Sequence, residues 1–414
     1  MDVSKPPVRP AGRLPGRSTR ILIGLIAGLA TGVVIAGSDA AAPVLAVAQP
    51  VGKLWIDGLT MTVVPLVFAL LVTGIAGAAA SAGGRVARLA MLWFAVLLVV
   101  ASLAAAALTT MALAAWPVPV EAASLRSATP PPDMAPVGAW FENIVPTNII
   151  RSAADTAMVP LVVFAMLFGF AISRIDPSLR DALQAVFKGL AQAMLVIVDW
   201  VLWLAPLGVF ALAIGVGVTA GVGAAGVLVH YMLLVIAACL LAIAIAYAAA
   251  IVIGRVSPAL FARSIVPAQV VAMSTQSSLA SLPAMVAAAA PLGVDRAAAG
   301  IMLPLSVSLF RMASAAANVA VAVYLGHLHG VPMGVGTLLL GALVAAPVSV
   351  AAVGLPAQVS FFAVVGPVCI AMGVPLTLLP LLLAIETIPD IFRTIGNVTG
   401  GLAVTRIVGR QVAP

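Results

Sequence analysis

The composition of this 414-residue chain excludes an ordinary water-soluble domain. Hydrophobic residues make up 63% of it and charged residues only 8%, and its mean hydropathy is +1.23. Soluble domains carry about a quarter charged residues, so this chain has too few charges to cover a hydrated surface. Long apolar tracts, each near the roughly 20 residues that a spanning helix needs, predict an all-α integral membrane protein. The formal net charge of +7 does not indicate a nucleic-acid partner, because the basic residues stand in short loops and tails.

The basic residues gather on one side of the predicted membrane. They precede the first apolar tract, follow the second and the fourth, and recur near the end: Arg9, Arg13, Arg17, Arg20, Arg85, Arg88, Arg174, Arg180, Lys188, Arg406 and Arg410. The segment 116–143 has three acidic residues and a single arginine. The positive-inside rule therefore predicts cytoplasmic termini in a multi-pass protein of the inner (cytoplasmic) membrane. A cleaved signal peptide is the less favoured alternative, because a multi-span chain can keep its first helix as an anchor.

Taken in chain order, the uninterrupted apolar tracts predict the spanning helices. They cover 21–37, 59–82, 88–115, 157–173, 193–222, 224–254, 297–325 and 373–405. Two further segments, 258–292 and 334–370, are apolar but interrupted by Ser, Gly, Pro and Gln. Broken backbone at membrane depth is tolerated only inside protein or beside a watery cavity. Two such segments in corresponding positions indicate a transporter's binding site, and two kinked spans are the alternative.

The centres of these two segments share a local pattern. Both place small residues ahead of a Leu-Pro pair: Ser277 and Ser278 ahead of Leu282-Pro283, and Ser349 and Gly354 ahead of Leu355-Pro356. Each centre offers hydroxyls, amides and a tip where two half-helices would meet. Helix N-termini at such a tip favour an anionic ligand through their free N–H groups and the helix dipole.

The last tract carries charges where lipid-compatible residues would be expected. Glu386, Asp390, Arg393 and Asn397 are spaced 4, 3 and 4 residues apart, so on a helix they share one face. Ionisable residues at that depth are costly and mark functional sites by default. A purely structural ion pair between Asp390 and Arg393 is the alternative.

Stretches along nearly the whole chain match one known pattern, in order. They are "MTVVPLVFALLVTGIA" (61–76), "PTNIIRSAADTAMVPLVVFAMLFGFAI" (146–172), "WLAPLGVFALA" (203–213), "SSLASLP" (277–283), "VGLPAQVS" (353–360) and "PDIFRTIGNVTGGLAV" (389–404). This pattern resembles the dicarboxylate/amino acid:cation symporter family, the glutamate and aspartate transporters. The resemblance implies eight transmembrane helices plus two re-entrant helical hairpins, in a homotrimer surrounded by membrane lipid.

The resemblance also implies an elevator-type division of the chain. Scaffold helices 1–2 would lie in residues 1–84 and scaffold helices 4–5 in 141–222. Transport-domain helix 3 and an extracellular loop would occupy 85–140. The core of the transport domain, with helix 6, hairpin 1, helix 7, hairpin 2 and helix 8, would occupy 223–414.

The family's substrate site transfers to matching positions of this sequence. Asp390 matches the carboxylate that binds the substrate's amino group, and Arg393 matches the guanidinium that holds its side-chain carboxylate, to which a bidentate fork is suited. The other matching positions are Ser277, Ser278, Ser314, Gly354, Leu355, Pro356, Thr394 and Asn397, with Asn397 and Ser278 on the α-carboxylate. Having both the arginine and the aspartate favours an acidic amino acid, aspartate or glutamate.

The departures concern the sodium sites. Where the family carries Asn-Met-Asp-Gly-Thr, this sequence reads Phe310-Arg311-Met312-Ala313-Ser314, and a sodium-binding Asp of the last helix is Gly401. Phe310 and Met312 supply no oxygen ligand, so the sequence predicts transport without sodium. Arg311 either replaces the charge of a bound sodium ion or pairs structurally with Glu386. Glu386 or Asp390 becomes the candidate proton carrier, because burial favours the neutral form of a carboxyl group.

Other function classes fit the sequence less well. Its three histidines are scattered and no nucleophile–base or metal constellation appears, so neither an enzyme nor a cofactor or metal site is expected. A C4-dicarboxylate carrier that uses Arg311 and Arg393 for two carboxylates is one alternative, and an anion-conducting, channel-like member is another. Symport and exchange both remain open.

Overall fold

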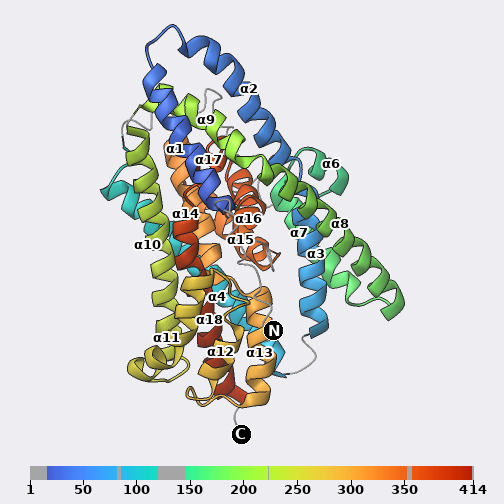
Figure 1. Ribbon diagram of the computed structural model, residues 1–414. Helices are drawn as coiled ribbons and strands as arrows, with labels where there is room; N and C mark the ends of the chain where they lie inside the picture. The colour runs from blue at the N-terminus through green and yellow to red at the C-terminus, as the bar shows by residue number, and fades with distance from the viewer. Residues whose placement is uncertain (1–15, 82–84, 120–144, 222, 352–356, 413–414) are drawn as a thin grey trace, which may run out of the picture.

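The computed structural model describes residues 16–81, 85–119, 145–221, 223–351 and 357–412, and every regular element in these ranges is a helix (Figure 1). In chain order the helices are α1 (Arg17–Ile35), α2 (Ala41–Thr60), α3 (Val63–Ser81), α4 (Arg85–Ala115), α6 (Ile149–Ala154), α7 (Met158–Ile172), α8 (Pro177–Trp203), α9 (Ala205–Ala220), α10 (Gly223–Val252), α11 (Pro258–Thr275), α12 (Leu282–Ala289), α13 (Arg296–Leu309), α14 (Met312–His329), α15 (Val335–Ala351), α16 (Ala357–Ala371), α17 (Leu379–Leu383) and α18 (Thr387–Val412).

Many of these helices have the length and composition of membrane spans. The described residues contain five helical segments long and apolar enough to cross a bilayer: Ala41–Gly77, Arg85–Ala115, Pro177–Trp203, Gly223–Val252 and Arg296–His329. Shorter apolar helices accompany them, among them Met158–Ile172 and Ala205–Ala220. The prediction of an all-helical chain with several spans is confirmed for the described residues, and the number of eight spans stays a prediction.

The helices differ from the expected ones in two places. Residues 41–58 were not among the predicted spans, because Lys53 and Asp57 lower their hydropathy, yet they form α2. The single tract 193–222 is divided at Leu204 into α8 and α9. Pro206 explains the division, because a proline lacks the N–H that a continuous helix requires and is accommodated in a first turn.

Helix α1 packs against α9 through a ladder of small residues. Gly24, Gly28 and Gly32 recur every four residues, and a methyl group on each would overlap the backbone carbonyl of Pro206, Phe210 or Ile214. Small residues at this spacing let two membrane helices approach closely, because dispersion contacts drive helix association in lipid. Helices α1, α2, α3, α7, α8 and α9 lie together at the top and right of Figure 1.

A second group surrounds α14. Helix α14 is buried along almost its whole length and packs against α4, α10, α15 and α18. A helix that is apolar and buried all round belongs at the centre of a bundle. Helices α11, α12 and α13 pack around the far end of α18, at the bottom of Figure 1.

Each of the two interrupted segments contains two helices that contact each other, and the re-entrant hairpins stay a prediction. Helices α11 and α12 contact each other across a tip at residues 276–281, and α15 contacts α16. Gln276 has φ of +50°, a left-handed conformation that reverses the chain after α11. The tip of the second hairpin, with Gly354, Leu355 and Pro356, lies outside the described residues.

Candidate functional site

A discontinuous helix brings a cation into the bundle. The chain leaves helical geometry at Phe310 (φ −107°, ψ 101°) and Arg311 (φ −122°, ψ 62°), between α13 and α14. The carboxyl-terminal helix α18 packs against both of these helices. We call Arg311, Glu386, Asp390 and Arg393 the charged cluster. Unwound backbone at membrane depth is tolerated where it lies inside protein or lines a cavity, which fits a binding site here.

The charged cluster contains a buried ion pair. Arg393 Nη2 lies 2.7 Å from Glu386 Oε1, and each side chain is only 5% exposed. Tyr231 of α10 donates a hydrogen bond to Glu386 Oε2 at 3.1 Å. Arg393 Nη1 donates to Asn318 Oδ1 of α14 at 2.7 Å. The guanidinium is therefore held from two sides, in the fixed orientation that recognition of a planar carboxylate requires.

This ion pair corrects both structural pairings weighed from the sequence. Arg393 pairs with Glu386 rather than with Asp390, and Arg311 does not pair with Glu386. The cause is the start of α18, where Asp390 N–H bonds to the carbonyl of Glu386 at 2.9 Å. Glu386 thus lies two helical turns before Arg393, on the same face.

Asn318 connects the ion pair to the second hairpin. Its Nδ2 donates to Ser349 Oγ of α15 at 3.3 Å, while its Oδ1 receives the bond from Arg393. Both side chains are fully buried. Sequence reasoning missed Asn318 and Tyr231 as site residues, although a lone amide and a lone phenol in otherwise apolar helices were the available signal. The contact gives the hairpin a direct polar link to the candidate substrate-binding arginine.

Asp390 and Arg311 differ from the ion pair because neither is neutralised directly. In the described residues neither side chain has an oppositely charged group within 4.0 Å. Their charges still interact with each other, and each also interacts with Arg393. Arg311 Nε is buried without a hydrogen-bond partner. One carboxylate and one guanidinium of the charged cluster therefore have no direct ion-pair partner in the described residues.

Asn397 of α18 holds the start of α14. Asn397 Oδ1 accepts from the N–H groups of Ala313 and Ser314, at 3.0 and 3.3 Å, and Asn397 Nδ2 donates to Ser314 Oγ at 2.9 Å. Thr394 Oγ1 donates to the carbonyl of Asp390 at 2.9 Å. Ser314, Thr394 and Asn397, all predicted from the sequence, therefore lie on adjoining faces of two helices. Polar groups there stabilise a helix N-terminus, which itself favours an anion.

The tip of the first hairpin reaches the start of α18. Gln276 Nε2 donates to the carbonyl of Thr387 at 3.3 Å. Ser277 is engaged within the tip, where its Oγ accepts from the N–H of Ala280 at 3.2 Å. Ser278 is half-buried beside it. Through this hydrogen bond from Gln276, the predicted tip contacts the segment that carries Glu386 and Asp390.

Apolar side chains fill the positions where the resemblance would put sodium ligands. Phe310 is buried and stacks on Phe94 of α4, with ring centroids 4.6 Å apart. Met312 is fully buried. A Cβ atom added to Gly401 would lie 2.8 Å from Ser306 Oγ and 3.0 Å from Met285 Cε. Sodium requires a shell of oxygen ligands, and thioether and phenyl groups supply none.

Restoring the missing carboxylate should damage the fold instead of creating a sodium site. We expect Gly401→Asp to lower the stability of the folded protein, because its Cβ already overlaps Ser306 and overpacking a tight interior costs about 1–3 kcal/mol. Thermal unfolding in detergent, with and without sodium, measures this. Gly401→Ala should show the steric part of the loss. Gly215→Ala is the matched control, because a Cβ there meets nothing within 4 Å. Sodium-dependent stabilisation of Gly401→Asp would contradict the prediction.

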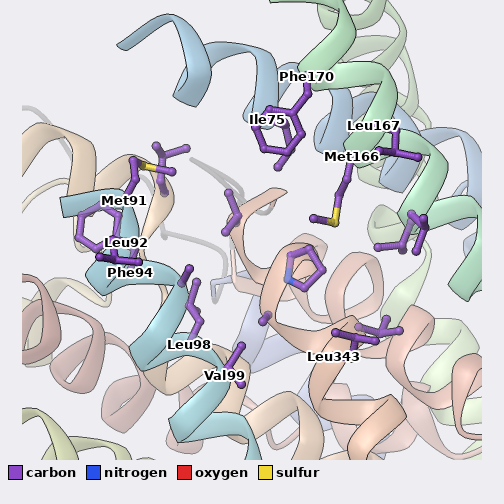
Figure 2. A pocket seen from close by; sticks show the side chains of 18 of the residues that line it. Ile75, Met91, Leu92, Phe94, Leu98, Val99, Met166, Leu167, Phe170 and Leu343 are labelled. Atoms are coloured by element: carbon purple, nitrogen blue, oxygen red, sulfur yellow. The ribbon is translucent and has the colours of Figure 1, made fainter. Parts of the chain in front are cut away.

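A separate cavity of about 640 Å³ lies between the two groups of helices. Figure 2 shows Ile75 of α3, Leu98 and Val99 of α4, Phe170 of α7 and Leu343 of α15 around it. Its lining side chains are apolar throughout. Such walls cannot replace the hydration of a charged ligand, so this cavity is not the site for an anionic substrate.

Comparison with known proteins agrees with this geometry. Residues 18–411 match the sodium:dicarboxylate symporter family. The chain is 26% identical to the "Proton/glutamate-aspartate symporter" of Escherichia coli (strain K12), over 87% of this chain and 84% of that protein. It is 27% identical to the "Proton/sodium-glutamate symport protein" of Bacillus subtilis (strain 168), over 95% of this chain and 92% of that protein. A protein of the same description from Bacillus caldotenax is also 27% identical, over 95% and 94% of the two chains. The chain is a multi-pass membrane protein and belongs to the sodium:dicarboxylate symporter family.

Proposed function

We propose that this protein is a secondary transporter of acidic amino acids, and that it works without sodium. The observation that carries the proposal is the pairing of a fixed guanidinium, Arg393, with a carboxylate that lacks a direct partner, Asp390. An acidic amino acid presents one ammonium and two carboxylates, so it needs both charges. The names of the relatives from E. coli and B. subtilis, which specify glutamate as cargo, support the same substrate class.

The arrangement suggests how such a substrate is held. The distal carboxylate of the substrate lies against Arg393, whose guanidinium is held in place by Glu386 and Asn318. The ammonium lies against Asp390. The α-carboxylate faces Asn397 and the first hairpin around Ser278, where helix N-termini favour negative charge. The second hairpin, through Gly354, Leu355 and Pro356, closes over the bound molecule.

The substrate site moves with the transport domain relative to the scaffold, with the division of the chain that the family resemblance implies. Residues 1–84 and 141–222 form a scaffold that makes the contacts of a homotrimer in the inner membrane, with both termini in the cytoplasm. Residues 85–140 and 223–414 form a transport domain that carries the site across the bilayer as an elevator. The two packing groups around α9 and around α14 support this division.

The coupling ion is a proton instead of sodium. Phe310 and Met312 fill the expected ligand positions with buried apolar groups, and the space beside Gly401 is taken by Ser306 and Met285. Glu386 and Asp390 are the carboxylates of the charged cluster, and either of them can carry the proton. Arg311 supplies a permanent positive charge next to Asp390, in the position where the resemblance places the motif methionine between two sodium ligands.

One observation favours a second cargo. Arg311 has no direct anionic partner in the described residues, so Arg311 and Arg393 together suit a C4-dicarboxylate that lacks an amine. Competition by succinate against labelled aspartate separates the two cargoes. Unitary currents without accumulation would instead indicate the channel-like alternative.

The proposal predicts that sodium is dispensable for binding. The purified protein in proteoliposomes should take up labelled aspartate or glutamate equally when external sodium is replaced by choline at fixed ionic strength, because no oxygen shell for sodium is built at these positions. An inward proton gradient should drive accumulation in both media. If substrate affinity falls in choline and added sodium restores it, the proposal of sodium independence is wrong.

A further inference from the structure

We propose that the transport cycle is electroneutral, with one proton moving with each acidic amino acid, and that Arg311 lets the empty carrier return without a proton. This inference rests on the proposed function, since it takes the charged cluster as the substrate site. Its basis is the number and sign of the charges that the fold brings together inside the bundle. Arg311, at the break between α13 and α14, brings the net charge of the empty cluster to zero.

The charged cluster has no net charge when it is empty. Arg311 and Arg393 contribute two positive charges, and Glu386 and Asp390 contribute two negative ones. An acidic amino acid adds one net negative charge, since it brings two carboxylates and one ammonium. One proton returns the loaded cluster to zero. A second proton would leave it with a net positive charge.

Net charge matters here because the cluster lies inside the helix bundle. Both members of the Glu386–Arg393 pair are 5% exposed, and Arg311 Nε is shielded and without a hydrogen-bond partner. An uncompensated charge in such surroundings is costly. The empty and the loaded forms are both neutral, so both can cross the bilayer, and the empty carrier returns without a counter-ion.

Among the described residues, the titratable groups that face the cluster do not alter its net charge. Tyr231 and Cys239 come from α10, and Cys369 comes from α16. All three are neutral in their ordinary protonated forms, and Asn318 on α14 does not titrate. The proton therefore resides on one of the carboxylates, Glu386, Asp390 or the substrate's own. It enters with the substrate and leaves with it, so no charge is transferred across the membrane.

The experiment measures net uptake of labelled aspartate into proteoliposomes that contain no substrate. The pH gradient is fixed, and the membrane potential is set with potassium and valinomycin. One net charge moved against 100 mV is worth roughly a 50-fold change in accumulation. We expect accumulation to change by less than about twofold between 0 and −100 mV inside, a bound set well below that figure. A potential-dependent uptake overturns electroneutrality, whereas no uptake of acidic amino acids at any pH contradicts the proposed function itself.

Two variants test whether Arg311 sets this balance. Arg311→Gln removes one positive charge, so the empty cluster has one net negative charge and must bind a proton before it returns. Net uptake should therefore fall, whereas exchange of labelled for unlabelled substrate, which needs no return of the empty carrier, should be retained. Arg311→Lys keeps the charge and should retain uptake that is insensitive to potential. Equal loss of net uptake in both variants, or unchanged net uptake by Arg311→Gln, overturns the role of Arg311. The voltage experiment on the unaltered protein stands independently of how well either variant folds.

Discussion

Arg393→Ala should abolish the uptake of acidic amino acids and leave weak binding of neutral ones. Arg393 is the cation of α18 that is held in place for a distal carboxylate, by Glu386 at 2.7 Å and by Asn318 at 2.7 Å. Removing one member of a buried charged pair costs about 3–5 kcal/mol, which corresponds to a loss of affinity of roughly 100-fold or more. Labelled uptake, together with aspartate-dependent protection from thermal unfolding, measures the change.

The same substitution also leaves the carboxylate of Glu386 buried without its cation, which lowers stability. Arg393→Ala combined with Glu386→Gln removes that orphan charge, so the double variant should recover stability without recovering transport. Arg406→Ala is the matched control on the same helix. Arg406 donates to the backbone carbonyls of Gly254 and Leu292, at 2.9 and 2.8 Å, so its loss should lower stability and spare aspartate affinity. Unchanged aspartate affinity in Arg393→Ala would remove Arg393 from the site.

Much of the helical framework could be predicted from the sequence, because long apolar tracts have few alternatives in a bilayer. The division of the two interrupted segments into paired helices was also predictable, since Ser, Gly and Pro interrupt them at corresponding places. Helix α2 was missed because Lys53 and Asp57 form an exposed ion pair, at 2.6 Å, that lowers the hydropathy of its window. The division of α8 from α9 was missed because a proline inside an apolar tract does not by itself distinguish a kink from a boundary.

The part of the candidate site that lies on a single helix was predictable from the spacing of its residues. The face shared by Glu386, Asp390, Arg393 and Asn397 follows from helical periodicity. The partners from other helices were not predictable, because Tyr231 lies 155 positions from Glu386 and Asn318 lies 75 positions from Arg393. A lone polar residue in an apolar helix indicates burial against something polar, but not which group it will meet.

Asp390→Asn should separate recognition of the amine from recognition of the carboxylates. The substitution keeps the shape of the side chain and removes the charge that attracts an ammonium. Asp390 has no direct ion pair in the described residues, so the change breaks no close ion pair and its main effect should fall on the ligand. Loss of one member of a desolvated charge pair costs about 2–5 kcal/mol, so aspartate affinity should fall on the order of 100-fold.

Succinate provides the discriminating comparison, because it keeps both carboxylates and lacks the amine. We expect succinate affinity in Asp390→Asn to stay constant or to rise, since a negative charge has been removed from beside Arg311 and Arg393. Asp181→Asn, an exposed substitution on α8 that touches only the exposed Arg180–Asp181 pair, is the control and should change neither affinity. The measurement is competition by unlabelled aspartate and succinate against one labelled ligand, at two external pH values. An equal fall in both affinities would assign Asp390 to the structure of the site or to proton coupling, and not to the amine. If the fall is confined to aspartate, the carboxylate of Asp390 is what makes this carrier select an amino acid over a dicarboxylate.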